Sequence, residues 1–144
     1  MRPEFVLALD VSSVSKAKRL ISIMYPKIKI YKVGLQLFTL AGPQIVDVIH
    51  RKNAQVFLDL KLHDIPNTVA SAVRQAVRMK VKMLTMHISG GEDMIKAAIK
   101  ARNEEAQKAH AKRPLLIGVT ILTSQSSTKE QVLALAKKGL SAGL

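Results

Sequence analysis

Cysteine and tryptophan are absent from the 144-residue chain, and aromatic side chains are few, with three Phe and two Tyr. The absence of cysteine excludes disulfide bonds and cysteine-ligated metal sites, and it is compatible with a reducing cytosol. No apolar run approaches the roughly 18 residues that a membrane-spanning helix requires. The opening sequence MRPEFVLALD lacks the apolar segment and cleavage site of a signal peptide. We therefore expect a cytoplasmic protein with an aliphatic core and no membrane association.

Acidic residues are also scarce. Ten Asp and Glu face 23 Lys and Arg, which gives a formal charge of +13. A positive charge favours anionic partners such as phosphorylated metabolites or nucleic acid. The basic residues are dispersed, however, and neither a nucleic-acid-binding motif nor interleaved aromatic residues accompany them. We interpret them as a solvated basic surface and expect no nucleic-acid partner.

A short apolar run followed by a longer stretch of helical periodicity recurs along the chain. The predicted strands are Phe5–Asp10, Lys29–Gly34, Ala54–Lys61, Met83–Ile88 and Leu115–Leu122. The predicted helices are Ser15–Met24, Gly42–Lys52, Pro66–Lys80, Glu92–His110 and Thr128–Lys138. Pro66 suits a first helical turn, and Ser127 with Glu130 suits a capping box. This strict alternation predicts a parallel sheet with helices outside it.

Two architectures fit the alternation, an open doubly wound sheet and a (β/α)8 barrel. A barrel needs about 200 residues or more, whereas five βα units are recognisable in these 144 residues. We expect a single domain over residues 1–144. It is either a complete small flavodoxin-like fold or the first five units of a barrel.

Charged residues lie where three consecutive predicted strands end. Asp10 closes the first strand, Lys32 lies near the end of the second, and the third carries Asp59 and Lys61. Side chains alternate along a strand, so Asp59 and Lys61 are expected on one face. A structural ion pair between these two is one interpretation. In parallel α/β folds, however, ligands bind at the carboxyl ends of strands, so four charges at one rim favour a functional site.

The segment LDLKLHDIPNTV, from Leu58 to Val69, resembles the signature of the orotidine 5'-phosphate decarboxylases. The resemblance continues in LALDV, KVGLQLFTLAGP, HISGGEDM and RPLLIGVTILTS, and it covers nearly the whole chain. The Asp-x-Lys-x-x-Asp element is shared with sugar-phosphate decarboxylases and aldolases of the same superfamily. The Ile-Pro-Asn-Thr extension makes the match to the orotidylate enzymes more specific.

The resemblance implies a (β/α)8 TIM barrel, of which five βα units are present, and the decarboxylation of orotidine 5'-monophosphate to UMP in pyrimidine biosynthesis. It implies no cofactor, with Lys61 as the proton donor, Asp59 and Asp64 beside it, and Lys32 in the same site. Fixed positive charge suits this reaction, because loss of CO2 leaves a carbanion at C6 of the pyrimidine.

Further contacts follow from the resemblance alone. Asp64 would enter the site of a partner subunit together with Ile65 and Thr68, which implies a homodimer. Asp10 and Lys32 would contact the ribose hydroxyls, and Thr123 the pyrimidine.

Other residues and alternatives complete the expectations. His63 and His87 lack a further ligand at metal spacing, so we expect no metal and assign His87 a hydrogen-bonding or packing role. A keto-gulonate phosphate decarboxylase using Mg²⁺ and a catalytically incompetent nucleotide-binding remnant are alternative functions. The phosphate-gripping Arg of the family lies in the last third of the barrel, so we expect an N-terminal portion with weak activity or none.

Overall fold

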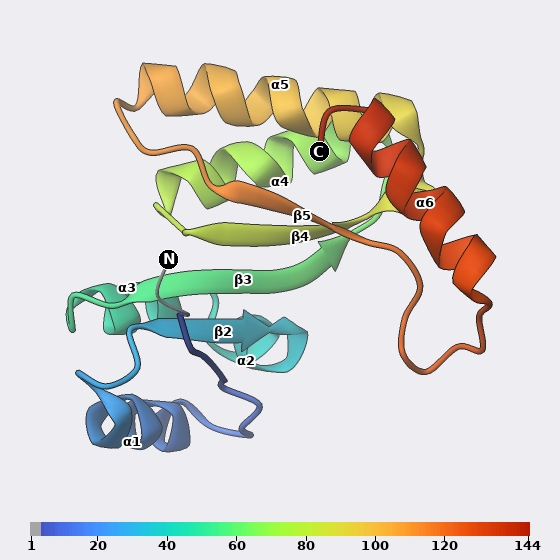
Figure 1. Ribbon diagram of the computed structural model, residues 1–144. Coiled ribbons are helices and arrows are strands. Elements are labelled where there is room, and N and C mark those ends of the chain that lie inside the picture. Colours follow the sequence, from blue (N-terminus) through green and yellow to red (C-terminus); the bar gives the residue numbers. More distant parts are fainter. Residues whose placement is uncertain (1–3) are drawn as a thin grey trace. The chain divides into compact units, whose positions relative to one another are not determined.

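The computed structural model describes residues 4–144, in which strands and helices alternate (Figure 1). The strands are β1 (Val6–Ala8), β2 (Ile30–Gly34), β3 (Gln55–Leu62), β4 (Met83–His87) and β5 (Leu115–Val119). The helices are α1 (Val14–Met24), α2 (Leu35–Ala41), α3 (Gln44–His50), α4 (Pro66–Arg78), α5 (Glu92–Lys108) and α6 (Lys129–Ser141), with a short 3-10 helix η1 (Ile88–Gly90) after β4. The strand order is β1-β2-β3-β4-β5, as successive right-handed βα units produce.

The chain divides into two compact units, and the division falls within β3 and β4. The first unit holds the described residues up to Leu60 together with Val81–Met83, and the second holds Lys61–Lys80 and Leu84–Leu144. No helix within residues 4–144 combines the length and hydropathy of a membrane span.

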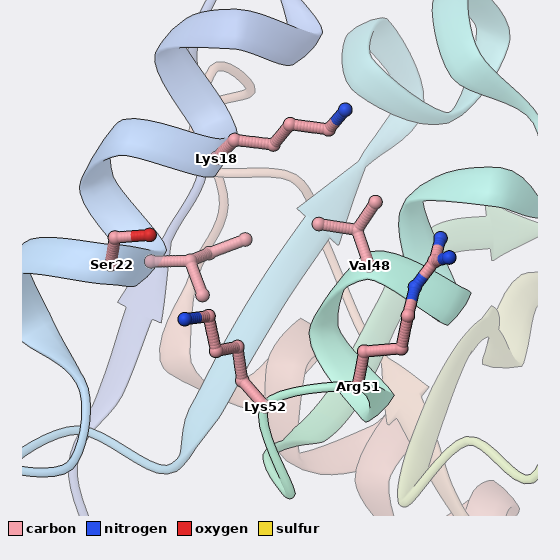
Figure 2. Close-up of a pocket in the computed structure, with 6 residues that line it drawn as sticks. Lys18, Ser22, Val48, Arg51 and Lys52 are labelled. Carbon is pink, nitrogen blue, oxygen red and sulfur yellow. The ribbon is translucent and has the colours of Figure 1, made fainter.

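In the first unit, β1, β2 and β3 pair in parallel, and Lys32 and Gly34 of β2 stand opposite Phe57 and Asp59 of β3. Helices α1, α2 and α3 contact one another. The core of this unit is aliphatic apart from Tyr31, and its fully buried members include Ile21, Val33, Leu37, Ile45, Ile49, Val56 and Leu58. A cleft of about 360 Å³ lies between α1 and α3 (Figure 2).

In the second unit, α4 packs along α5. Both helices bury mostly small and branched side chains, which include Val69, Val73, Ala76, Val77, Ile95, Ala98 and Ala101. Residues three and four apart line one face of a helix, so this spacing produces the apolar stripe that each helix buries. At the edge of the contact, Arg78 Nε donates to Glu105 Oε1 over 2.7 Å.

Two details of the predicted helices are wrong. The predicted helix Gly42–Lys52 corresponds to α3, but the structure has another helix before it. This helix, α2, begins directly at the end of β2 with Gly34 as its N-cap. The capping box of α6 is formed by Thr128 and Gln131, whose side chains each bond to the other's backbone N–H. The predicted box was one residue too early. Pro66 does occupy the first turn of α4, as predicted.

Candidate active site

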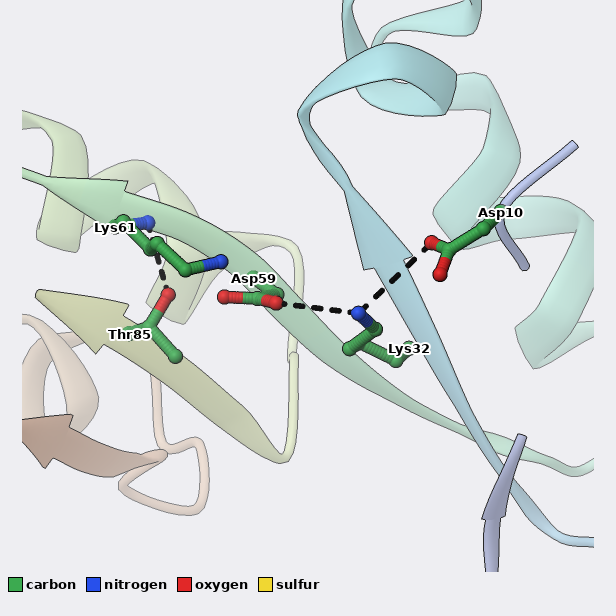
Figure 3. Close-up of polar contacts among 5 residues, drawn as sticks. All are labelled: Asp10, Lys32, Asp59, Lys61 and Thr85. Atoms are coloured by element: carbon green, nitrogen blue, oxygen red, sulfur yellow. Dashed lines mark hydrogen bonds and ion pairs between the residues drawn. The ribbon is translucent and has the colours of Figure 1, made fainter. Parts of the chain in front are cut away.

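A three-residue charge cluster lies at the carboxyl ends of the first strands. Lys32 Nζ lies 3.4 Å from Asp59 Oδ2 and 3.8 Å from Asp10 Oδ1, so the ammonium bridges two carboxylates (Figure 3). Lys32 comes from β2 and Asp59 from β3, while Asp10 follows β1 by two residues. Of the four charges that the sequence places at one rim, Asp10, Lys32 and Asp59 therefore do meet at one sheet edge.

The two carboxylates differ in their surroundings. Asp59 is only 8% exposed, whereas the side chain of Asp10 is 67% exposed. Burying a carboxylate is costly unless a cation and hydrogen bonds compensate it. We conclude that Lys32 is held mainly by Asp59, because the longer contact to Asp10 is screened by water.

Lys61 follows Asp59 by two residues in β3, so the two Cα atoms are separated by about 7 Å of strand. The backbone of Lys61 is unusual, with φ of +51°. Residues that carry a Cβ rarely adopt this left-handed backbone conformation, which costs roughly 1–2 kcal/mol. Strained residues of this kind occur disproportionately at functional sites.

One hydrogen bond secures this strained position. The Lys61 N–H donates to Thr85 Oγ1 of β4 over 2.8 Å (Figure 3). Thr85 is only 3% exposed, so its hydroxyl is a fixed acceptor inside the protein. Sequence reasoning missed Thr85, because a threonine in a buried strand is also an ordinary β-sheet residue.

The predicted interface residues gather at the start of α4. Asp64 Oδ1 accepts from the N–H of Ile65 over 2.6 Å, and a carboxylate at a helix N-terminus suits the helix dipole. Ile65 is 66% exposed, and Thr68 in the first turn is exposed as well. Thr123, the remaining predicted site residue, lies exposed in the turn after β5.

The two predicted histidines form a pair, with their ring centroids 5.4 Å apart. The pKa of His87 is lowered by burial and by the nearby His63 and Lys61, because each disfavours a further positive charge. Within residues 4–144 no group of three or more His, Asp or Glu side chains is arranged to hold a metal ion.

Comparison with known proteins identifies one family. The family model for the orotidine 5'-phosphate decarboxylase / HUMPS family matches residues 3–139. Two curated relatives are the orotidine 5'-phosphate decarboxylases of Lawsonia intracellularis, 49% identical over 122 residues, and of Moorella thermoacetica, 43% identical over 123 residues. The alignments cover 84% and 85% of this chain but 52% and 49% of the relatives, so the chain spans about half their length.

Solved structures give the same fold. An uncharacterized conserved protein of Geobacillus kaustophilus superposes with a TM-score of 0.89 at 33% identity, over 97% of this chain and 70% of that one. The orotidine 5'-phosphate decarboxylase of Lactobacillus acidophilus gives 0.84 at 30% identity, over 99% and 69%. These matches confirm the predicted fold class, in which five βα units of the (β/α)8 barrel family are present.

Proposed function

The chain belongs to the orotidine 5'-phosphate decarboxylase / HUMPS family, and from this premise we propose that it acts in the decarboxylation of orotidine 5'-monophosphate to UMP. The observation that carries the proposal is the three-residue charge cluster together with the strained Lys61 that follows it in β3. A buried carboxylate, Asp59, is paired with Lys32 on the neighbouring strand. A second lysine, Lys61, follows two residues later in a strained backbone conformation.

Lys61 is the proton donor in this proposal. The bond between C6 of the pyrimidine and the carboxylate carbon breaks, CO2 leaves, and the electron pair stays on C6. The Lys61 ammonium stabilises that developing negative charge and then transfers a proton to C6, which yields UMP. In this step Lys61 acts as the ammonium that donates its proton.

Asp59 and Lys32 have complementary roles. Asp59 is buried and contacts Lys32, and its proposed role is to supply fixed negative charge beside Lys61. Lys32 and the exposed Asp10 present an ammonium and a carboxylate at the rim, and they are proposed to bind the ribose hydroxyls. Thr123, in the turn after β5, is proposed to contact the pyrimidine.

A homodimer with shared sites is part of the proposal. Asp64, Ile65 and Thr68 all lie at the exposed start of α4, and a large apolar side chain that is 66% exposed, such as Ile65, suits an interface. Asp64 is proposed to enter the site of the partner subunit, where it adds the second carboxylate near Lys61.

The direct test is decarboxylation of carboxyl-labelled orotidine 5'-monophosphate, with release of labelled CO2 as the readout. We expect at most weak release by the purified chain, loss of that release in Lys61→Ala, and unchanged release in the control Lys100→Ala, whose side chain is 77% exposed on α5. A chelator should have no effect. Release that survives Lys61→Ala would refute the assigned proton donor, and release that the chelator abolishes would indicate a metal-dependent lyase.

The shared site has its own test. Lys61→Ala and Asp64→Ala proteins, each inactive alone, should recover activity when mixed, because one site of each mixed dimer holds both native residues. If subunit exchange is demonstrated and activity does not return, the shared site is refuted while the decarboxylase proposal stands.

A further inference from the structure

The cleft between α1 and α3 carries a charge pattern that the proposed reaction does not use. Six residues line its volume of about 360 Å³, namely Lys18, Ile21, Ser22, Val48, Arg51 and Lys52. All six belong to the first unit, and Lys18 and Lys52 extend into the gap between the helices (Figure 2). From these observations we infer that the cleft is a binding site for a small organic phosphate.

The residues on the two sides of the cleft have the same spacing in the sequence. Positions 18, 21 and 22 follow the spacing i, i+3, i+4 along α1, and positions 48, 51 and 52 repeat it at the end of α3. Residues at this spacing share one helix face. Helix α1 therefore lines the cleft with Lys18, Ile21 and the hydroxyl of Ser22, whereas the other side is lined by Val48 of α3 and by Arg51 and Lys52 of the turn that follows it.

The apolar and basic residues are placed at different depths. Ile21 is 1% exposed and Val48 is half-buried, whereas Lys18, Arg51 and Lys52 are exposed. The cleft thus has an aliphatic floor and a cationic rim. Such a combination fits a ligand with an apolar body and a terminal phosphate or diphosphate, since pockets of about 300 Å³ or more take small organic molecules.

The three cations are not neutralised by the protein. Within the part of the chain that the structure describes, Lys18, Arg51 and Lys52 take part in no ion pair or side-chain hydrogen bond. No acidic side chain lines the cleft. The nearest carboxylate along α3, Asp47, lines a neighbouring groove with His50 and Arg51. A bound phosphate would relieve the mutual repulsion of these like charges and receive charge-assisted hydrogen bonds.

Calorimetric titration of the whole 144-residue chain with ADP and with pyrophosphate, at low ionic strength, tests the inference. ADP should bind more tightly than pyrophosphate, because only ADP has a body that covers Ile21 and Val48. The double variant Lys18→Gln/Lys52→Gln should weaken ADP binding by on the order of tenfold. The matched control Lys108→Gln/Lys129→Gln, which removes the same charge from exposed positions of the second unit, should change it by less than about threefold.

Backbone amide shifts locate the bound ADP without any substitution. We expect shifts at residues 18–22 and 48–52 and none at Lys32 or Asp59. Absence of binding, an equal loss in both double variants, or shifts confined to Lys32 and Asp59 would each overturn the cleft assignment. Displacement of ADP by a short single-stranded RNA at equal phosphate concentration would assign the cleft to nucleic acid and overturn the small-ligand inference.

Discussion

Tyr31 offers a sharp test of how the first unit is held together. Its side chain is fully buried in β2, next to the site residue Lys32. The Tyr31 hydroxyl lies 3.0 Å from the carbonyl oxygen of Ile28 and 3.3 Å from that of Ile21, and it donates to this pair. One side chain therefore fixes the end of α1 and the loop after it to the strand that presents Lys32.

The cost of Tyr31→Phe follows from these contacts. The Ile21 carbonyl also accepts from the N–H of Tyr25 over 3.0 Å, so it keeps one donor after the substitution. The Ile28 carbonyl, which is part-buried, loses the Tyr31 donor. Leaving a part-buried acceptor unmatched costs about 1–2 kcal/mol, which corresponds to a decrease of about 0.5–1 M in the urea midpoint.

Tyr25→Phe is the matched control. It is the same substitution, and within the described residues the Tyr25 hydroxyl makes no hydrogen bond, so we expect a change within about 0.5 kcal/mol. Urea unfolding followed by circular dichroism gives both values. Equal free energies of unfolding for the two variants would refute the assigned role of Tyr31.

The pH dependence of the free energy of unfolding gives a second comparison of the native chain with Tyr31→Phe. Burial, and to a smaller degree the neighbouring Tyr25, raises the pKa of Tyr31 above its ordinary value of 10.0. A raised pKa in the folded state means that the stabilisation is complete below pH 10 and is lost as the pH rises toward the folded value. The advantage of the native chain over Tyr31→Phe should therefore shrink above pH 10. A constant difference would refute the burial argument.

Two further predictions concern the second unit. The Arg78 hydrogen bond holds the pKa of Glu105 below its ordinary value of 4.5, so this stabilisation is present above pH 4.5 and is lost as the pH falls through the lower folded value. Glu105→Gln should therefore lower the urea midpoint at neutral pH, and the difference from the native chain should close in acid. In Gly90→Ala the new Cβ would overlap the thioether of Met94 and lie 3.2 Å from His63 Cδ2. Because Met94 is fully buried, we expect Gly90→Ala to lower the free energy of unfolding in urea by about 1–3 kcal/mol. Adding Met94→Ala in a double variant should partly relieve the part of this loss that comes from the overlap.

The order of elements and the charge cluster were predictable from the sequence because both depend on simple periodicities. Parallel strands place their carboxyl ends at one edge, so charges at the ends of β1, β2 and β3 had to meet. Which charges pair was less predictable. The sequence offered an ion pair of Asp59 with Lys61 as a structural alternative to a site, and the structure shows a contact of Asp59 with Lys32, which the neighbouring strand brings close.

The errors at helix ends have local causes. Helix α2 was not predicted, because the apolar run LQLFTLA directly follows β2 and its N-cap, Gly34, makes no side-chain cap. The sequence SSTKEQ contains two overlapping capping-box patterns, Ser127 with Glu130 and Thr128 with Gln131. Both satisfy the same spacing rule, so the rule alone does not select the one that α6 uses.

The least predictable feature of the site, the hydrogen bond from Lys61 to Thr85, supports a final prediction. The two residues lie 24 positions apart, and the bond holds the backbone of Lys61 at a positive φ. Thr85→Val keeps the shape of the side chain but removes the acceptor, so the part-buried Lys61 N–H loses the Thr85 hydroxyl. We expect a loss of about 1–3 kcal/mol in urea unfolding.

Thr85→Ser is the matched control, because it restores the acceptor and removes only a methyl group. It should recover most of the stability, together with the protection of the Lys61 amide against hydrogen exchange. If Thr85→Val leaves that protection unchanged, the hydroxyl does not hold the Lys61 backbone, and the positive φ must be imposed by the packing of β3 instead.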